Sequence, residues 1–454
     1  MKILFVSLGC EKNRVETEYM LGILNEHGYE FTDDALDAEA AVVNTCCFIN
    51  DAKQESIDTI LELAEYRKSG KMRALIVAGC LGQRYKEEIQ KEIPEVDEII
   101  GTTAYDKVVE ALDNVLKGQV QNYFESIDRK PTTHKRILST GTPYSYLKIA
   151  EGCNKNCTYC IIPKVRGHYR SVPMEVLIEE AKDLVDNGIK ELIIVAQETT
   201  VYGVDLYGRK MLPELLQELC KIEELEWIRV MYCYPEEITD ELIEVMKKEA
   251  KICHYLDLPI QSGSDRILKK MGRRTDNADI RRIVEKLRAE IPDICLRTTL
   301  ISGFPSENAD DHNQTMKLIS DLKFDRLGVF TYSPEEDTVA ATMEDQVPER
   351  TKKTRRTKLM KMQQEFAFDG AKKMVGRKLK AIIEGRIGDD EPDIDDLGRP
   401  LYTYVARTYK DSPDIDGFLF IENVPYDLMS GKFVDVRITG SDGYDLIGEI
   451  DDEE

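Results

Sequence analysis

Short apolar runs alternate with amphipathic stretches over the first 127 residues. The predicted strands lie at 2–7, 40–44, 74–78 and 98–101, and the predicted helices lie at 16–27 and about 52–66. Short apolar strands separated by helices indicate a parallel sheet with helices on both faces. From about 125 to 144 the apolar pattern lapses into Pro, Thr, Ser and basic residues, which is typical of a linker.

The middle of the chain repeats a strand and then a helix six times. The predicted strands lie at 146–150, 191–196, 227–232, 255–260, 295–301 and 326–331, with helical patterns at 174–187, 212–222, 238–248 and 279–290. Right-handed crossovers between successive parallel strands curl such a repeat into a barrel. Because a complete eight-unit barrel needs about 250 residues, six units in about 200 residues predict a partial (β/α)6 barrel. Its site is expected at the C-terminal ends of the strands.

A basic stretch and then several β-like segments end the chain. Residues 350–380 are rich in Lys and Arg, which would suit either a solvated helix face that closes the barrel or a surface that touches RNA. The β-like segments lie at 379–383, 417–421, 432–438 and 444–450, between Gly, Pro and Asp residues. This pattern predicts a small antiparallel β-barrel. The chain is therefore expected to be an α/β protein with domains at 1–127, 128–374 and 375–450.

Composition narrows the class of protein. The chain has 454 residues, of which 42% are hydrophobic, and no window approaches the roughly 18 apolar residues that a membrane span needs. The first apolar run leads to Cys10 without a small-residue cleavage site, so we expect a strand there, not a signal peptide, and a cytoplasmic protein. The formal net charge of −23 would repel nucleic acid in general and favours a basic partner.

The chain contains 11 cysteines. A cytoplasmic compartment keeps thiols reduced, so clustered cysteines point to metal ligation or catalysis and not to disulfides. Cysteines in apolar runs are expected to be small core residues. These are Cys220, Cys233, Cys253 and Cys295.

Cys153, Cys157 and Cys160 follow the first predicted barrel strand with the spacing Cys-x3-Cys-x2-Cys. Three thiolates on one tight loop can hold three corners of a four-iron, four-sulfur cluster and leave the fourth iron open to an exchangeable ligand. The alternatives are a structural zinc site, which normally needs a fourth protein ligand such as His168, or a loop without metal.

Cys10, Cys46 and Cys80 share another context, because each ends an apolar strand. The intervals of 36 and 34 residues each suit one strand–helix unit. Three cysteines at the same end of neighbouring parallel strands would converge, which predicts a second cluster; the alternative is three independent core residues. Cys47 would point to the opposite face of its strand.

The loop at 153–160 resembles that of the radical S-adenosylmethionine superfamily, whose hallmark is this spacing with an aromatic residue, here Tyr159, before the last cysteine. The resemblance implies that S-adenosylmethionine chelates the open iron. It also implies that an electron from the cluster cleaves the sulfonium bond and yields a hydrogen-abstracting 5′-deoxyadenosyl radical.

The sequences Gly-Cys-Glu-Lys-Asn at 9–13, Asn-Thr-Cys-Cys-Phe-Ile at 44–49 and Gly-Cys-Leu-Gly-Gln-Arg at 79–84 resemble the methylthiotransferase family. That resemblance covers almost the whole chain. It implies a flavodoxin-like first domain with an auxiliary four-iron, four-sulfur cluster, a radical barrel and a C-terminal TRAM domain. The implied reaction replaces a C–H bond with C–S–CH3 and uses S-adenosylmethionine as both radical source and methyl donor.

Further stretches resemble the cofactor-binding edge of the same family. The expected contacts of S-adenosylmethionine are Gln197 and Glu198, after the second barrel strand, and Arg297 and Gly303, around the fifth. Tyr159 in the cysteine loop is a further expected contact. Gly303 would allow the backbone to approach the ligand closely. Arg166 and Arg170 could contact a carboxylate or phosphate, or could be ordinary surface charges.

The family has two branches with different substrates. One methylthiolates an adenosine in transfer RNA, and the other, the RimO type, modifies the β-carbon of an aspartate in the twelfth small-subunit ribosomal protein. Residues 376–454 contain nine Lys and Arg against twenty Asp and Glu, so this domain has a negative net charge. A negative charge disfavours binding of RNA and favours binding of a basic ribosomal protein. The sequences at 406–417 and 444–448 also resemble the RimO type. An external electron donor and a sulfur donor, unknown from sequence, are also implied. The alternative to an enzyme is a non-catalytic iron–sulfur protein that carries electrons.

Overall fold

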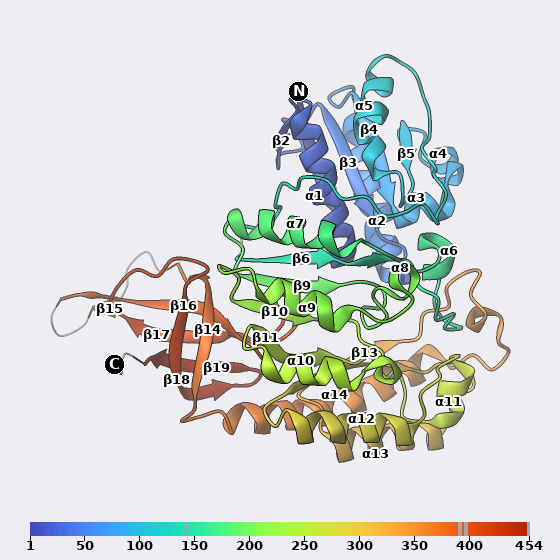
Figure 1. Ribbon diagram of the computed structural model, residues 1–454. Coiled ribbons are helices and arrows are strands. Elements are labelled where there is room, and N and C mark those ends of the chain that lie inside the picture. Colours follow the sequence, from blue (N-terminus) through green and yellow to red (C-terminus); the bar gives the residue numbers. More distant parts are fainter. Residues whose placement is uncertain (142, 389–392, 395–397, 452–454) are drawn as a thin grey trace.

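A computed structural model describes residues 1–141, 143–388, 393–394 and 398–451. The molecule has three main sheets, and the N-terminal, middle and C-terminal parts of the described chain each form one of them (Figure 1). Among the described residues, no helix is both long and apolar enough to cross a membrane.

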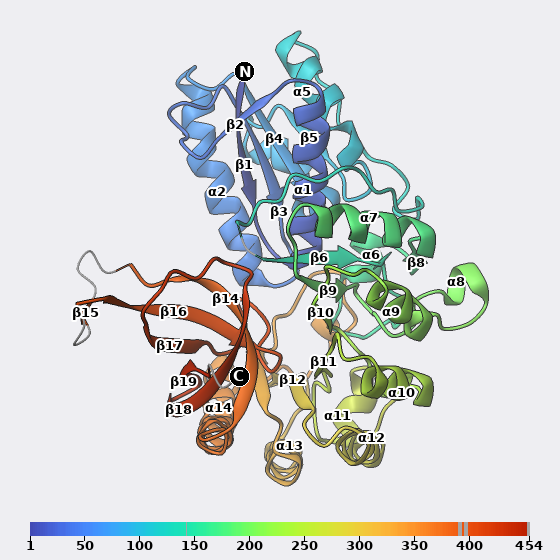
Figure 2. The same ribbon diagram turned by 60° about the vertical axis from the view of Figure 1, so that its left-hand side comes forward.

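The N-terminal sheet is parallel, with the strand order β2-β1-β3-β4-β5. Its strands are β1 (Lys2–Ser7), β2 (Glu30–Thr32), β3 (Ala40–Thr45), β4 (Ala74–Gly79) and β5 (Glu98–Ile100). Its helices are α1 (Glu11–Glu26), α2 (Asn50–Lys68), α3 (Cys80–Tyr85), α4 (Glu87–Glu92) and α5 (Val108–Leu116), with a 3-10 turn at Tyr105–Lys107. β3 and β4 are buried along their whole length because helices cover both faces of the sheet (Figure 2). The predicted parallel α/β fold is confirmed.

The second sheet contains six parallel strands in the order β13-β12-β11-β10-β9-β6, which is a partial barrel. The strands are β6 (Tyr144–Lys148), β9 (Glu191–Val195), β10 (Trp227–Val230), β11 (Ile252–Asp257), β12 (Cys295–Ser302) and β13 (Arg326–Thr331), and β7 (Ala150–Glu151) and β8 (Arg170–Ser171) form a small separate pair. The larger helices are α7 (Met174–Asp186), α9 (Leu212–Cys220), α10 (Asp240–Lys248), α12 (Asn277–Glu290), α13 (Ala309–Leu322) and α14 (Glu349–Lys372). The shorter helices are α6 (Ile162–Arg166), α8 (Val204–Tyr207) and α11 (Asp265–Lys270), with 3-10 turns at Pro235–Glu237 and Ala340–Thr342.

The two faces of this sheet pack against different partners. One face forms an apolar core with the surrounding helices, in which Cys233 is fully buried and Cys220 packs at the edge. The other face carries Tyr146, Val195 and Met231 into the core of the N-terminal domain. The N-terminal domain therefore covers the open side of the partial barrel, as Figures 1 and 2 show.

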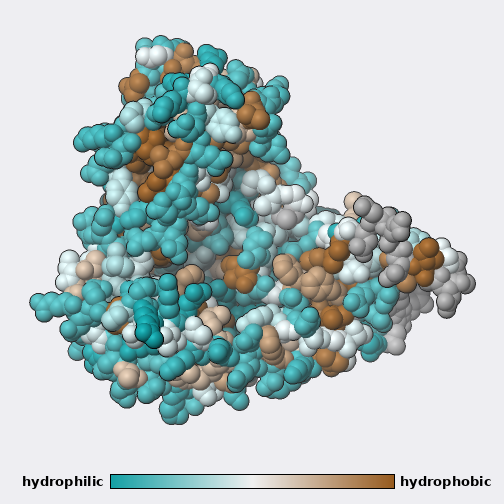
Figure 3. Space-filling view, turned by 180° about the vertical axis from the view of Figure 1, so that it is seen from behind, coloured by the Kyte–Doolittle hydropathy of each residue, from teal (hydrophilic) through white to brown (hydrophobic). Residues whose placement is uncertain are grey.

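The C-terminal part is a closed five-stranded barrel, as predicted. The five strands of the barrel are β14 (Lys378–Arg386), β16 (Pro400–Thr408), β17 (Leu419–Val424), β18 (Phe433–Asp442) and β19 (Asp445–Ile450). A short sixth strand, β15 (Asp393–Ile394), pairs with β16 outside the ring. β14, β16, β17, β19 and β18 close the ring through antiparallel pairs, except that β17 and β19 pair in parallel. In Figure 3 hydrophilic residues cover most of the visible surface, and apolar residues gather in a few patches on the N-terminal and C-terminal parts.

Candidate functional site

The loop that carries Cys153, Cys157 and Cys160 runs from β7 to α6 at the C-terminal side of the barrel sheet. Backbone bonds fix it: the Cys153 N–H donates to Gly167 O at 3.1 Å, and the Cys160 N–H donates to Cys157 O at 3.0 Å. Gly152 has φ +77°, and a Cβ there would lie 2.1 Å from the carbonyl oxygen of His168. The chain therefore needs glycine immediately before the first cysteine.

Hydrogen-bonding groups lie beside two cysteines of this triad, and two cations flank the ring of one of those groups. The Lys155 N–H donates to Cys153 Sγ at 3.4 Å, and the Tyr234 hydroxyl lies 3.4 Å from Cys157 Sγ. The Tyr234 ring has Arg273 4.1 Å and Lys155 4.7 Å from its centroid. Burial raises the pKa of Cys153 to about 11, so metal binding here must displace a proton. Donors and cations suit an anionic thiolate cluster.

The arrangement fits an iron–sulfur cluster better than zinc. In the part of the chain that the structure describes, no three His, Cys, Asp or Glu side chains form a group that could hold a single metal ion. A cubic cluster does not require such a group, because each thiolate binds a different iron. His168, the only close candidate for a fourth zinc ligand, has 81% of its side chain exposed and pairs with Asp128.

Cys10, Cys46 and Cys80 come together at one edge of the N-terminal sheet. Cys10 precedes α1, Cys46 follows β3 and Cys80 begins α3, at the ends of the adjacent parallel strands β1, β3 and β4. A Cβ on Gly9, whose φ is +91°, would lie 3.0 Å from Cys46 Sγ, and Cys80 Sγ lies 3.9 Å from Asn13 Oδ1. Burial raises the pKa of Cys46 and of Cys80. The predicted convergence is therefore present in the fold.

Cys47 belongs to the apolar core of this domain and is 1% exposed, and Cys253 and Cys295 are buried in the barrel. Cys253 and Cys295 have the packing role that the sequence predicted, and Cys47 packs in the core as well.

A buried ion-pair network joins the two triads. Arg166, in α6 just beyond Cys160, donates to Asn13 Oδ1 at 2.5 Å and to the carboxylates of Glu16 and Glu151. Lys148 Nζ lies 2.7 Å from Glu16 and 2.9 Å from Glu151. Arg166 is 1% exposed, so its interpretation as a surface charge is wrong. Its partners are the carboxylates of Glu16 and Glu151 and the amide oxygen of Asn13. Two of these three partners are carboxylates, which is one of the contacts that the alternative interpretation allowed.

A second connection is the segment after β10, which the sequence did not reveal. The Tyr232 hydroxyl donates to Glu11 Oε2 at 2.6 Å, next to Cys10, while Tyr234 reaches Cys157. Tyr232 has φ +61°, a conformation that costs a bulky residue energy and that clusters at functional sites. The segment thus spans from one triad to the other.

Polar groups at the ends of the barrel strands are left without partners. Gln197 Oε1, Glu198 Oε2 and Gln261 Oε1 are buried without a hydrogen bond, and burial raises the pKa of Glu198 to about 7. The Gln197 amide donates to Glu151 Oε1 at 3.0 Å, which ties it to the Arg166 network. Buried polar atoms normally have partners, so this set fits a polar ligand such as S-adenosylmethionine.

The remaining predicted cofactor contacts have other neighbours. Tyr159 packs edge-on against Phe304 with the ring centroids 6.4 Å apart. Gly303 has φ +75°, but a Cβ there would meet the side chain of Lys352 at 2.3 Å. Arg297 lies near the start of β12, where it pairs with Asp257 at 2.9 Å and with Asp416 at 3.6 Å. Its expected cofactor contact therefore stays a prediction.

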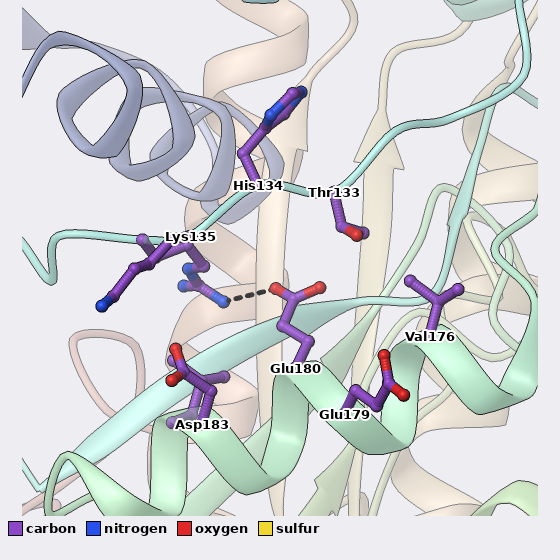
Figure 4. Close-up of a pocket in the computed structure, with 9 residues that line it drawn as sticks. Thr133, His134, Lys135, Val176, Glu179, Glu180 and Asp183 are labelled. Atoms are coloured by element: carbon purple, nitrogen blue, oxygen red, sulfur yellow. Dashed lines mark hydrogen bonds and ion pairs between the residues drawn. The ribbon is translucent and has the colours of Figure 1, made fainter. Parts of the chain in front are cut away.

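A cavity of about 330 Å³ lies apart from these cysteines, between the linker and α7 (Figure 4). Glu179, Glu180 and Asp183 line it from α7, and His134 and Lys135 line it from the linker. Arg136 donates to Glu180 at 3.1 Å and fills part of the gap. No cysteine borders this cavity.

Three family models match the chain: Uncharacterized protein family UPF0004 at residues 2–101, the Radical SAM superfamily at 147–319 and the TRAM domain at 375–450. The structure is similar to that of TsrM, a radical S-adenosylmethionine methyltransferase from Kitasatospora setae, with a TM-score of 0.54 over 75% of this chain and 76% of the other. At 12% identity this shows a shared fold only.

Curated relatives match over the full length. The chain is 57% identical to "Ribosomal protein uS12 methylthiotransferase RimO" of Lachnoclostridium phytofermentans over 99% of both chains. It is 46% identical to the protein of the same description in Clostridioides difficile, again over 99% of both chains. Taken with the radical barrel and the closed C-terminal barrel, this identity shows that the chain belongs to the RimO family of methylthiotransferases.

Proposed function

We propose that this enzyme adds a methylthio group to the β-carbon of an aspartate in ribosomal protein uS12. The full-length similarity to RimO relatives carries the proposal, because the match covers 99% of this chain and so spans the segments that carry both cysteine triads and the C-terminal barrel. It favours this function over transfer RNA modification and over a non-catalytic electron carrier.

We propose two four-iron, four-sulfur clusters. Cys153, Cys157 and Cys160 would hold the cluster that binds S-adenosylmethionine and supplies the electron for its cleavage. Cys10, Cys46 and Cys80 would hold the auxiliary cluster that carries or activates the inserted sulfur. Two cysteines of each triad are buried, while Cys10 and Cys160 are half-buried. This burial and the hydrogen-bonding groups beside Cys153 and Cys157 support the assignment.

The cofactor contacts are proposed at the ends of the barrel strands. Gln197 and Glu198 offer unpartnered buried oxygens there, and such atoms can accept the amino and ribose hydrogens of S-adenosylmethionine. Tyr159 would line the site from the cluster loop, and the positive φ of Gly303 would shape the chain beside it. Arg297 is the weakest of the proposed contacts, because two carboxylates already neutralise it.

The chain's own groups would prepare the site for radical chemistry. The Lys155 N–H donates to Cys153 Sγ, and the Tyr234 hydroxyl, 3.4 Å from Cys157 Sγ, would donate to a thiolate there. The Arg273 guanidinium lies over the Tyr234 ring and would hold it in place. The N-terminal domain packs on the open face of the barrel. It would thereby limit the access of bulk water to the space between the triads.

The acidic C-terminal domain would attract the basic ribosomal protein. It is fixed beside the open barrel, since Arg407 donates to Glu191 at 2.8 Å and Asp416 reaches Arg297. A ribosomal substrate would place the enzyme in the cytoplasm, where an external electron donor and a sulfur donor must serve it.

The test offers uS12 and transfer RNA side by side to the anaerobic, reduced holoenzyme with S-adenosylmethionine. Mass spectrometry should find the methylthio group on a uS12 aspartate and none on the nucleosides. A product on the nucleosides alone would overturn the substrate assignment, and the absence of 5′-deoxyadenosine would overturn the radical reaction itself.

A further inference from the structure

Lys12 is a buried cation beside the auxiliary triad. It lies in the first turn of α1, two residues after Cys10, and is only 5% exposed. A buried ammonium is costly unless a counter-charge or hydrogen bonds compensate it. The contacts of the Lys12 ammonium therefore show whether it still has a hydrogen-bond donor available for a ligand.

Those neighbours leave the ammonium incompletely satisfied. Lys12 Nζ lies 3.5 Å from Glu11 Oε2, and 3.3 Å above the ring centroid of Tyr232. The first distance exceeds the 2.7–3.2 Å typical of a good N–H···O bond. Glu11 Oε2 meanwhile accepts a closer bond from the Tyr232 hydroxyl at 2.6 Å. An ammonium has three N–H donors, so Lys12 retains capacity for another acceptor.

Lys12 contacts the segment that connects the two triads. The target C–H must lie within reach of the radical source at Cys153, Cys157 and Cys160 and of the sulfur at the auxiliary triad. Lys12 contacts Tyr232 on the same short segment whose Tyr234 reaches Cys157. The strained φ of +61° at Tyr232 holds that ring against the ammonium. Lys12 is thus two residues from a cysteine of one triad and in contact with the segment that reaches a cysteine of the other.

We propose that Lys12 binds the side-chain carboxylate of the substrate aspartate, which makes it a specificity-determining residue. The inference rests on the proposed function and goes beyond it. A buried ammonium–carboxylate bond is charge-assisted and directional, so it would hold the β-carbon next to the carboxylate in a fixed orientation between the triads. A substrate without a carboxylate at this position would leave the ammonium without its acceptor.

The test is a double-mutant cycle on binding, measured anaerobically by calorimetry. It uses the holoenzyme with and without Lys12→Met and full-length uS12 with its target aspartate either intact or replaced by asparagine. The unmodified enzyme should bind the aspartate form about tenfold or more tightly than the asparagine form, in line with a charge-assisted bond in a buried site. The Lys12→Met variant should bind both forms equally.

Two further variants serve as controls. Lys53→Met removes another lysine that lies over a tyrosine ring, 5.7 Å from Tyr85, and should keep the discrimination. If Lys12→Met loses iron, Lys12→Gln supplies an uncharged side chain of similar length for the same comparison. Discrimination that survives the loss of the Lys12 charge overturns the inference alone. If neither form of uS12 binds the unmodified enzyme, the substrate assignment falls, and the inference falls with it.

Discussion

The two cysteine triads are built in opposite ways. Cys153, Cys157 and Cys160 lie on one loop that short backbone bonds hold together. Cys10, Cys46 and Cys80 are separated by whole strand–helix units and meet only because β1, β3 and β4 are parallel neighbours. The first site is local and the second depends on the tertiary fold. A local distortion of the sheet edge should therefore destroy the second triad and spare the first.

The largest effect is expected from removing one ligand of each triad. Cys157→Ala should abolish formation of 5′-deoxyadenosine, because the remaining two thiolates cannot hold the cluster that cleaves S-adenosylmethionine. Cys46→Ala should keep that cleavage and lose the methylthiolated product. Chromatography of 5′-deoxyadenosine beside mass spectrometry of uS12 separates the two outcomes. Equal loss of cleavage in both variants would show that the triads are not independent.

A matched pair of glycine substitutions tests the geometry of each site. In Gly9→Ala the new Cβ would lie 2.6 Å from Cys46 Cβ, and in Gly152→Ala it would lie 2.1 Å from His168 O, both at positive φ. Each should cost about 1–3 kcal/mol of folding free energy from backbone strain alone. Gly9→Ala should lower the iron content at the auxiliary triad only, and Gly152→Ala at the radical triad only. Iron and sulfide assays combined with 5′-deoxyadenosine formation check this; unchanged iron content in either variant would contradict it.

Arg166 connects the two sites, so its removal should affect both. Arg166→Gln would leave Glu16 and Glu151 with Lys148 as their main counter-charge in a buried network, which should cost about 3–5 kcal/mol of stability. Chemical denaturation monitored by circular dichroism measures the loss. Arg67→Gln breaks a partly exposed pair with Asp97 and should cost about 1 kcal/mol or less. Similar losses in the two variants would mean that the network adds little.

The smallest effect is expected from Tyr234→Phe. It removes one hydroxyl 3.4 Å from Cys157 Sγ and should lower the reduction potential of the radical cluster, because hydrogen bonds to cluster sulfurs stabilise the reduced state. EPR-monitored reduction measures the shift. Tyr202→Phe, whose hydroxyl donates to Val172 O, should leave the potential unchanged. An unchanged potential in Tyr234→Phe would exclude a bond to the bound cluster.

The same contrast explains what could be predicted from sequence. The spacing of the three cysteines and their place after a barrel strand predicted the loop of Cys153, and the recurrence of cysteine at strand ends predicted that Cys10, Cys46 and Cys80 converge. Both signals lie in the order of residues along the chain. The short strand β2 was missed because three residues show no periodicity, and β16 was missed because its polar residues interrupt the apolar pattern.

Interactions across domains were beyond such reasoning. Arg166 is buried because α6 packs against the N-terminal domain, where Arg166 bonds to Asn13 of α1. Lys12 reaches Tyr232 because the N-terminal domain covers the barrel. The positive φ of Tyr232 has no sequence signal, since a bulky residue is disfavoured there. The motif around Arg297 likewise gave no sign that Asp257 and Asp416 pair with it.

The most direct test of the two-site account is the iron and labile sulfide content of anaerobically purified protein. The unmodified enzyme should hold about eight irons per chain, and Cys46→Ala and Cys157→Ala should each hold about four. An unmodified enzyme with about four irons, or with zinc on either triad, would contradict the account.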